Sequence, residues 1–299
     1  METVKKVAVL YATDDNVNQK AFKYPAGEWQ VRLHEKTVNE IVDASLVRII
    51  ADIKSSDDIM KLLLLHDAVL KHNHSIKVYM PYLPYSRADR RFVPGDCAGL
   101  QVFSKLIEHM DVSTLDMHNP NVIVPNLKNI SAAPFILKAI ESFKLNCEIY
   151  TKYSSVNVLF PDKGAHDRYS EDIPEYLGNN HEKITINKFY CLKQRNPVTG
   201  EFSGFDVPVD KISHEYPTII IDDLCDGGGT FNGIADILMK ENPYILGLYV
   251  THGIFSKGLS ELLKRFYRIY TTNSYWQHVF QEDSEIVSFN CYPELFKKS

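Results

Sequence analysis

The sequence predicts an α/β protein of two tandem domains, each built on a mainly parallel sheet flanked by helices. Short apolar segments alternate along the chain with amphipathic segments of helical periodicity, which is the pattern of βαβ units. The chain has 299 residues, more than a single domain usually holds, and it contains no glycine-rich or serine-rich linker. We therefore expect two closely docked domains, residues 1–133 and 134–279, with residues 280–299 joining the first.

The elements of the first half follow from local patterns. Strands are expected at Val7–Tyr11, Leu46–Ile50, Ile76–Met80 and Val112–Met117, because each is a short apolar run. Ser55 and Asp58 resemble a capping box, and the apolar residues after them follow one helical stripe, so a helix is expected there. A second helix is expected over residues 98–109.

The second half repeats this alternation, with helices between several of its strands. The strands are expected at Val156–Phe160, Ile184–Asn187, Thr218–Ile221, Ile245–Val250 and Tyr267–Thr271.

Composition narrows the functional class. Hydrophobic residues make up 44% and charged residues 24% of the chain, which is typical of a globular protein, and the net charge of −5 gives no reason to expect nucleic acid as a partner. The leucine run Leu62–Leu65 is far too short to span a bilayer, so we expect a cytoplasmic protein with no membrane partner. The five cysteines are widely spaced without a Cys-x-x-Cys pair, which favours reduced thiols.

The most informative segment runs from Ile219 to Thr230, where an apolar strand meets two acids and then a glycine-rich turn. The backbone N–H groups of such a turn point at the start of the next helix and suit a phosphate group. Asp222 and Asp223 offer acceptors to vicinal ribose hydroxyls. The segment therefore indicates a site for a phosphorylated sugar, with an ordinary polar loop as the alternative.

This segment resembles the ribose-phosphate motif of the type I phosphoribosyltransferase fold, and other motifs are similar to those of the ribose-phosphate pyrophosphokinase family. The run Pro81-Tyr82-Leu-Pro84-Tyr85-Ser-Arg87-Ala-Asp89-Arg90-Arg91 resembles that family's ATP-binding signature, which ordinary phosphoribosyltransferases lack. The remaining matches occur in the family's order at Leu115–His118, Phe160–Gly164, Leu192–Arg195 and Val250–Gly253. The resemblance implies two tandem phosphoribosyltransferase-like domains.

The resemblance also implies a reaction, the transfer of the pyrophosphoryl group of ATP to the anomeric hydroxyl of ribose 5-phosphate with Mg²⁺. Such a transfer depends on positioning and on neutralising phosphate charge. His118 and Asp162 match the family's positions for the magnesium nucleotide, and Asp222 and Asp223 match its ribose ligands. The loop of the sugar phosphate is matched by Asp226, Gly227, Gly228, Gly229 and Thr230.

The resemblance places further residues at the nucleotide. Arg87 and Asp89 match nucleotide contacts, and Arg90 adds positive charge. Tyr24 and Glu28 align with a segment that holds the adenine, usually from a neighbouring subunit, which implies a homo-oligomer, at least a dimer. An ordinary turn is the alternative for that segment.

Lys193 and Arg195 match a basic pair that the family uses to stabilise the transferring phosphates. Both lie in a polar segment with Pro197 and Gly200, as expected of a mobile loop. A solvated hairpin with incidental charges is the alternative. His252 lies where the family places a residue near the ribose, and a purely structural histidine is equally compatible with the sequence.

Departures from the family pattern leave the acceptor open. Ala26 and Ala88 replace polar residues near the nucleotide, and Gly227 and Gly228 replace residues that often include a hydroxyl, which opens space at the phosphate. A larger acceptor such as ADP-ribose, in NAD salvage, is therefore one alternative. A non-catalytic regulatory homologue is another.

Overall fold

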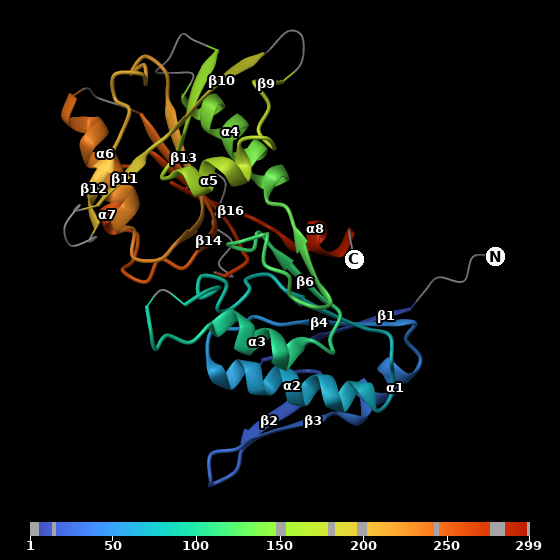
Figure 1. Ribbon diagram of the computed structural model, residues 1–299. Helices are drawn as coiled ribbons and strands as arrows, with labels where there is room; N and C mark the ends of the chain where they lie inside the picture. The colour runs from blue at the N-terminus through green and yellow to red at the C-terminus, as the bar shows by residue number, and fades with distance from the viewer. Residues whose placement is uncertain are drawn as a thin grey trace. The chain divides into compact units, whose positions relative to one another are not determined.

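The chain forms two compact units in the computed structural model (Figure 1), Met1–Ile130 with Cys291–Ser299 and Ser131–Asn290. We call them unit 1 and unit 2. Only the backbone is described at residues 193–195, 202, 203 and 241. The described residues are 6–13, 16–91, 93–147, 154–178, 183–195, 202–241, 245–275 and 285–297.

Unit 1 contains a five-stranded parallel sheet in the order β1-β4-β5-β6-β7. Beside it a hairpin of β2 and β3 packs against α2. The strands are β1 (Val7–Tyr11), β2 (Gln19–Lys23), β3 (Trp29–Leu33), β4 (Leu46–Ile50), β5 (Ile76–Met80), β6 (Val112–Leu115) and β7 (Leu127–Ile130).

Helices cover both faces of this sheet. Leucine, isoleucine and phenylalanine side chains of α1 (Glu35–Val42), α2 (Ser56–Leu70) and α3 (Gly99–Ile107) share one apolar core with alternate strand residues, and Figure 1 shows these helices on one side. On the other face α8 (Tyr292–Lys297) contacts Tyr79 of β5 through Phe296, with ring centroids 4.7 Å apart. The N-cap of the predicted capping box is confirmed, because Ser55 Oγ accepts from Asp58 N–H at 3.3 Å, while Asp58 Oδ2 accepts from the backbone N–H of Lys54 at 3.1 Å.

Unit 2 contains a seven-stranded sheet in the order β16-β15-β14-β13-β8-β10-β9, parallel except for the short edge strand β9. A separate two-stranded ribbon pairs β11 with β12. The strands are β8 (Ser155–Phe160), β9 (Tyr176–Leu177), β10 (Ile184–Tyr190), β11 (Leu192–Arg195), β12 (Phe202–Asp206), β13 (Thr218–Cys225), β14 (Leu246–Gly253), β15 (Arg268–Thr272) and β16 (Ile286–Phe289).

The helices of unit 2 also lie on both faces. Apolar side chains of α6 (Gly229–Glu241) and α7 (Ser260–Leu263) share a core with Ile220, Leu248 and Ile269 of the sheet. The other face is covered by α4 (Ala133–Cys147), whose Phe143 lies directly against Gly247. The short helix α5 (Lys163–Tyr169) follows β8. The predicted α/β architecture with mainly parallel, helix-flanked sheets is confirmed.

Several details differ from the sequence expectations. The strands β2, β7, β9, β11, β12 and β16 were not expected, and β6 ends at Leu115 rather than at Met117. The strand β16 belongs to the sheet of unit 2, whereas Cys291–Ser299 belong to unit 1. Among the described residues, no helix is long and apolar enough to cross a membrane.

Candidate functional site

The candidate residues of unit 2 gather at the carboxyl edge of its sheet. Because β8, β13 and β14 are parallel neighbours, the segments that follow them meet at one edge, where α/β proteins commonly bind ligands. Asp162 follows β8, Asp222 and Asp223 lie near the end of β13, and the glycine loop follows directly. The fold therefore places the predicted magnesium residue Asp162 and the predicted ribose acids on the same edge.

The two acids have different environments. Burial raises the pKa of Asp222 well above its ordinary value, and the charge of Asp223 raises it further. Asp222 Oδ1 accepts from the backbone N–H of Asp223 at 2.9 Å. Asp223 is buried and forms an ion pair with Arg168, whose Nη1 lies 3.2 Å from Asp223 Oδ2. Of the two adjacent carboxylates, Asp223 thus has the guanidinium of Arg168 beside it.

Arg168 is a residue that the sequence analysis missed. It lies in the last turn of α5, and its side chain is 14% exposed. A basic residue at this helix end carries no local signal of function. Its relation to the candidate site can be recognised only from the structure, because the pairing of β8 with β13 brings α5 beside the two acids.

Asp162 lies at the start of α5. Its carboxylate accepts from Ala165 N–H at 2.9 Å and caps the helix. The charge of Asp162 also raises the pKa of Asp222, although burial and the charge of Asp223 raise it more. Burial raises the pKa of the Cys191 thiol to about 12, and the charge of Asp162 contributes to this increase. Asp162 follows β8, and the two acids lie near the end of its parallel neighbour β13, so all three carboxylates lie at one edge of the sheet. One carboxylate side chain thus combines a capping role with a place at the candidate site.

The glycine loop leads from β13 into α6. Gly228 has a φ of 76°, a conformation that favours glycine, and its carbonyl accepts from Asn232 N–H at 3.0 Å. Thr230 lies in the first turn of α6. A helix of this length presents unpaired backbone N–H groups at its start, so the loop and α6 can bind an anion such as the predicted 5-phosphate.

The space beside the glycines corrects one expectation from the sequence. A Cβ at Gly227 would lie 3.3 Å from the aliphatic stem of Lys257, and a Cβ at Gly228 would lie 3.2 Å from Leu262. At Gly229 a Cβ would meet no atom within 4 Å. The first two glycines therefore accommodate neighbouring side chains rather than opening space, and the open side of the loop is at Gly229.

A second loop, residues 254–258, braces the first. Cys225 O accepts from Ile254 N–H at 2.9 Å and from Phe255 N–H at 3.1 Å. Asp226 accepts from Ser256 twice, through its backbone carbonyl at 3.1 Å and through Oδ1 at 2.5 Å. The glycine loop is therefore fixed to the segment that follows β14.

His252 has a structural environment. It is 2% exposed, and its Nδ1 lies 2.7 Å from Ser274 Oγ. The Ser274 hydroxyl donates to Thr251 O at 3.0 Å, so it can only accept from the imidazole, which fixes the proton on Nδ1. These contacts support the structural alternative of the sequence analysis.

The motif at Pro81–Arg91 forms a loop after β5 in unit 1. Tyr85 has a φ of 61°, and its carbonyl accepts from Ala88 N–H at 2.8 Å. Arg87 and Arg90 are exposed, whereas Asp89 is half-buried and accepts from Asn119 Nδ2 at 2.7 Å. This loop therefore presents two arginines to solvent, and it is linked to the residue that follows His118.

His118 lies just beyond β6. The backbone turns there through Asp116, which has a φ of 48° and whose N–H donates to Ile130 O at 2.9 Å. Asn129 Oδ1 then accepts from Met117 N–H at 2.9 Å. These two bonds to β7 fix the path of the chain into His118, so the predicted ATP residues His118 and Asp89 belong to neighbouring loops.

Tyr24 and Glu28 form the tip of the β2–β3 hairpin. Tyr24 N–H donates to Glu28 O at 2.8 Å, and Gly27 N–H donates to Tyr24 O at 2.8 Å with Gly27 at a φ of 98°. Tyr24 is 47% exposed. The predicted adenine segment is therefore a well-formed turn with an accessible aromatic ring.

Lys193 and Arg195 lie on β11, and their side chains are outside the described residues. The backbone of β11 pairs with β12, with Lys193 opposite Phe205 and Arg195 opposite Phe202. The predicted mobile segment after Arg195 is also outside the described residues, from 196 to 201.

Magnesium has chemically suitable ligands in unit 2. Mg²⁺ prefers oxygen ligands and is usually held by one or two carboxylates together with waters and substrate phosphates. The partly exposed carboxylate of Asp162, close to Asp222, fits that pattern. A cluster of three or more His, Cys, Asp or Glu side chains close enough to hold a metal is not found in the described part of the chain.

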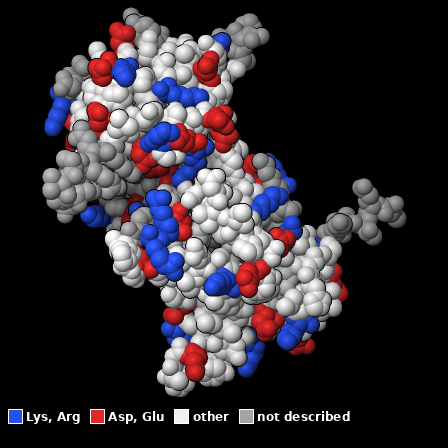
Figure 2. Space-filling view, viewed as in Figure 1, with Lys and Arg blue, Asp and Glu red and all other residues white. Residues whose placement is uncertain are grey.

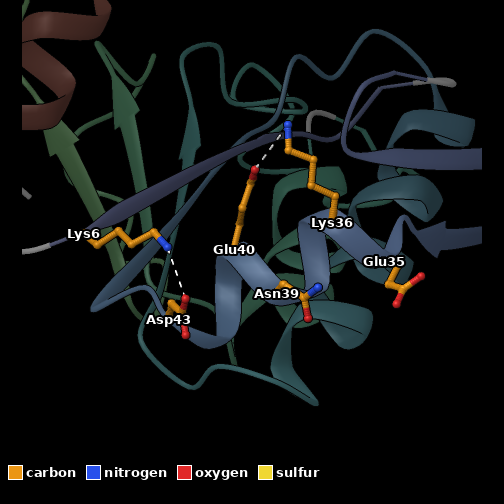
Figure 3. Close-up of a pocket in the computed structure, with 6 residues that line it drawn as sticks. All are labelled: Lys6, Glu35, Lys36, Asn39, Glu40 and Asp43. Carbon is orange, nitrogen blue, oxygen red and sulfur yellow. Dashed lines mark hydrogen bonds and ion pairs between the residues drawn. The ribbon is translucent and has the colours of Figure 1, made fainter.

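One hollow among the described residues lies at α1, and none of the candidate residues lines it. Figure 3 shows a pocket of about 480 Å³ at α1, lined by Lys6, Glu35, Lys36, Asn39, Glu40 and Asp43. Lys6 and Lys36 pair there with Asp43 and Glu40. The pocket in Figure 3 is thus a hollow among exposed ion pairs.

Acidic and basic side chains are interspersed over the described part of the face in Figure 2.

Comparison with known proteins finds similarity to ribose-phosphate pyrophosphokinases. Residues 5–110 match the model of the N-terminal domain of ribose phosphate pyrophosphokinase. The chain is 28% identical over 253 residues to a ribose-phosphate pyrophosphokinase of Pyrococcus furiosus, covering 83% of this chain and 82% of that protein. It is 27% identical over 256 residues to the enzyme of that name from Pyrococcus abyssi, covering 83% and 81% of the two chains.

A solved structure supports the fold across both units. The chain superposes on the phosphoribosylpyrophosphate synthetase of Mycobacterium smegmatis with a TM-score of 0.71, covering 98% of this chain and 97% of that one at 17% identity. The similarity thus extends over nearly the whole chain.

Proposed function

We infer that this chain is a divergent member of the ribose-phosphate pyrophosphokinase family of enzymes, and we propose that it transfers the pyrophosphoryl group of ATP to the anomeric hydroxyl of ribose 5-phosphate, yielding phosphoribosyl pyrophosphate and AMP. The observation that carries the proposal is the edge of unit 2, where Asp222 and Asp223 lead directly into a braced glycine loop and the start of α6. This order of acids and anion-binding backbone suits a sugar with vicinal hydroxyls and a 5-phosphate.

In this proposal each element of unit 2 has one task. Asp222 and Asp223 accept hydrogen bonds from the ribose hydroxyls. The backbone at Gly227–Gly229 and the Thr230 hydroxyl bind the 5-phosphate, and the bonds between Asp226 and Ser256 keep the loop in shape. The sugar is thereby held with its anomeric hydroxyl in a fixed place, which is the main protein contribution to phosphoryl transfer.

Unit 1 supplies the nucleotide side of the proposal. Arg87 and Arg90 provide positive charge for the phosphates of ATP, and His118 and Asp89 line the same group of loops. Tyr24 can stack on the adenine and Glu28 can accept from its amine. We expect the hairpin that carries them to serve a neighbouring subunit in a homo-oligomer, at least a dimer.

In unit 2, Asp162 would hold magnesium, and in unit 1, His118 is the candidate ligand or orienting group for the magnesium nucleotide. When bound, Mg²⁺ neutralises charge on the transferring phosphates. Asp162 contributes a carboxylate that already lies close to the ribose acids.

Lys193 and Arg195 are the proposed stabilisers of the transition state. Exchanging Lys193 for Ala should lower kcat by about a hundredfold or more while the KM for each substrate changes little, because the charge is needed while phosphate charge develops. Unchanged pyrophosphoryl transfer by Lys193→Ala would remove this residue from the mechanism.

A larger acceptor is the second candidate. The open side of the loop at Gly229 can admit a substituent on the 5-phosphate, and the exposed Lys257 beside Gly227 offers a cation to a second phosphate. ADP-ribose has both features, and its use would assign the protein to NAD salvage.

Product analysis separates these candidates. The purified protein is incubated with ATP and Mg²⁺, with ribose 5-phosphate and ADP-ribose offered separately, and AMP release and product mass are measured. We expect AMP and phosphoribosyl pyrophosphate with ribose 5-phosphate. Turnover of ADP-ribose alone would establish the larger acceptor, and turnover of neither would contradict the proposed activity and favour a regulatory role.

A further inference from the structure

Arg168 forms a largely buried ion pair with the second ribose acid. Its Nη1 lies 3.2 Å from Asp223 Oδ2, and the two side chains are 14% and 5% exposed. Arg168 comes from α5, while Asp223 comes from β13, so the pair joins two residues that are 55 positions apart in the sequence. An ion pair shielded from water in this way has a fixed geometry, unlike most surface pairs.

The guanidinium is held from its own side as well. Arg168 Nη1 donates to the Tyr169 hydroxyl at 3.3 Å, and the guanidinium lies 5.4 Å from the centre of the buried Tyr169 ring. The chain just after α5 is tied to β10, because Lys188 Nζ donates to Ser170 O at 2.6 Å and also to Ile173 O. Arg168 therefore reaches Asp223 from a restrained position.

This contact affects how Asp223 can meet a ligand. A carboxylate accepts up to about four hydrogen bonds, so the bond to Arg168 leaves acceptor capacity for sugar hydroxyls. The same bond restrains the side-chain torsion angles of Asp223 and therefore the orientation of its carboxylate. It also offsets the repulsion between Asp222 and Asp223, which burial strengthens.

We propose that Arg168 is a positioning residue for the sugar, acting through Asp223 so that the paired ribose acids present one fixed arrangement of acceptors to the vicinal hydroxyls. The inference deepens the proposed function and rests on it. Arg168 acts on substrate binding and takes no part in phosphate transfer.

Kinetics of Arg168→Gln test the proposal. We expect the KM for ribose 5-phosphate to rise about tenfold or more, because small displacements of a positioning group weaken binding strongly. The KM for ATP and kcat should change by less than about threefold, since hydroxyl contacts are made alike in the ground state and the transition state. Arg168→Lys should recover part of the loss, because it restores the charge without the planar guanidinium.

The matched control is Arg265→Gln, which removes an arginine–aspartate pair from the surface of the same unit. Arg265 Nε lies 2.7 Å from Asp236 Oδ1, and Asp236 is 53% exposed. This variant should keep the KM for the sugar. A purely structural role of Arg168 would lower the melting temperature but leave the sugar KM of the folded variant unchanged, and that result would overturn the inference.

A double substitution tests whether Arg168 acts through Asp223. In an Asp223→Asn background, Arg168→Gln should raise the sugar KM by less than about twofold further, because the residue to be positioned is already altered. A full tenfold effect in that background would overturn the proposed route. If Arg168→Gln does not fold, Arg168→Lys is used in its place. The inference would be rejected if neither Arg168→Lys nor Asp223→Asn changed the KM for ribose 5-phosphate.

Calorimetric titration of ribose 5-phosphate separates this inference from the proposed function. If the wild-type protein binds no ribose 5-phosphate, the proposed function fails. If it binds and Arg168→Gln binds equally well, the proposed function stands and the role of Arg168 is rejected.

Discussion

The candidate residues of unit 2 and those of unit 1 are supported in different ways. In unit 2, Asp162, Asp223 and Asp226 each accept a bond from a residue on another part of the fold or cap a helix. In unit 1, Tyr24, Arg87 and Arg90 extend from a hairpin tip or a loop and are exposed. The proposed sugar side thus lies on the sheet edge, whereas the proposed nucleotide side is carried on accessible turns.

If both proposals hold, this difference means that the sugar site is preformed, whereas the nucleotide groups complete their site when ATP binds. A sheet edge holds side chains rigidly, because each is supported by packed neighbours. Substitutions in exposed turns lower the stability less, and such turns commonly carry ligand-binding residues. Substitutions should therefore affect stability together with binding in unit 2, whereas replacing an exposed side chain at the hairpin tip in unit 1 should affect mainly binding.

The largest expected effect is on stability, for Gly253→Ala at the end of β14. A Cβ there would lie 2.2 Å from Phe255 Cε2 and 2.9 Å from Thr271 Oγ1, so neighbouring groups must move. We expect the free energy of unfolding of unit 2 to fall by about 3 kcal/mol or more. Thermal unfolding followed by calorimetry measures this loss.

Gly27→Ala at the hairpin tip is the matched substitution in unit 1. A Cβ there would meet no atom within 4 Å, and only the φ of 98° is unfavourable for alanine. The expected loss is about 1 kcal/mol. Equal losses for the two variants would contradict the difference between a supported edge and an open turn.

The two ribose acids should respond to neutralisation with opposite signs. The pKa of Asp222 is raised in the folded state, so the folded protein binds the proton more tightly than the unfolded chain, and the ionised carboxyl lowers stability above its ordinary pKa of 3.8. Asp222→Asn should therefore raise the melting temperature at pH 7. Asp223→Asn removes the negative charge paired with the largely buried Arg168 and should cost about 3 kcal/mol.

The pH dependence provides the control for this pair. The gain from Asp222→Asn should shrink as the pH falls toward 3.8, where the carboxyl becomes protonated in both states. Both variants should bind ribose 5-phosphate less tightly. A loss of stability for Asp222→Asn at pH 7 would mean that its carboxylate stabilises the empty site.

How much the sequence could predict depends on whether the cause is local. The acids and the glycine loop were recognisable because an Ile run, two carboxylates and a turn are adjacent in the chain. Arg168 was missed, since its partner is set by the strand order β13-β8. The role of Gly227 was misjudged for the same reason, because Lys257 from the loop after β14 occupies the adjacent space.

The smallest effect on stability is expected at Tyr24, and it sharpens the comparison most directly. Because the ring is 47% exposed, Tyr24→Ala should change the melting temperature little. If the ring stacks on adenine, the KM for ATP should rise about tenfold, with the KM for ribose 5-phosphate unchanged. Tyr176→Ala removes a ring that is 48% exposed in unit 2 and should leave both constants unchanged. An ATP KM unaffected by Tyr24→Ala would remove the hairpin tip from the nucleotide site, and with it the reason to expect a neighbouring subunit there.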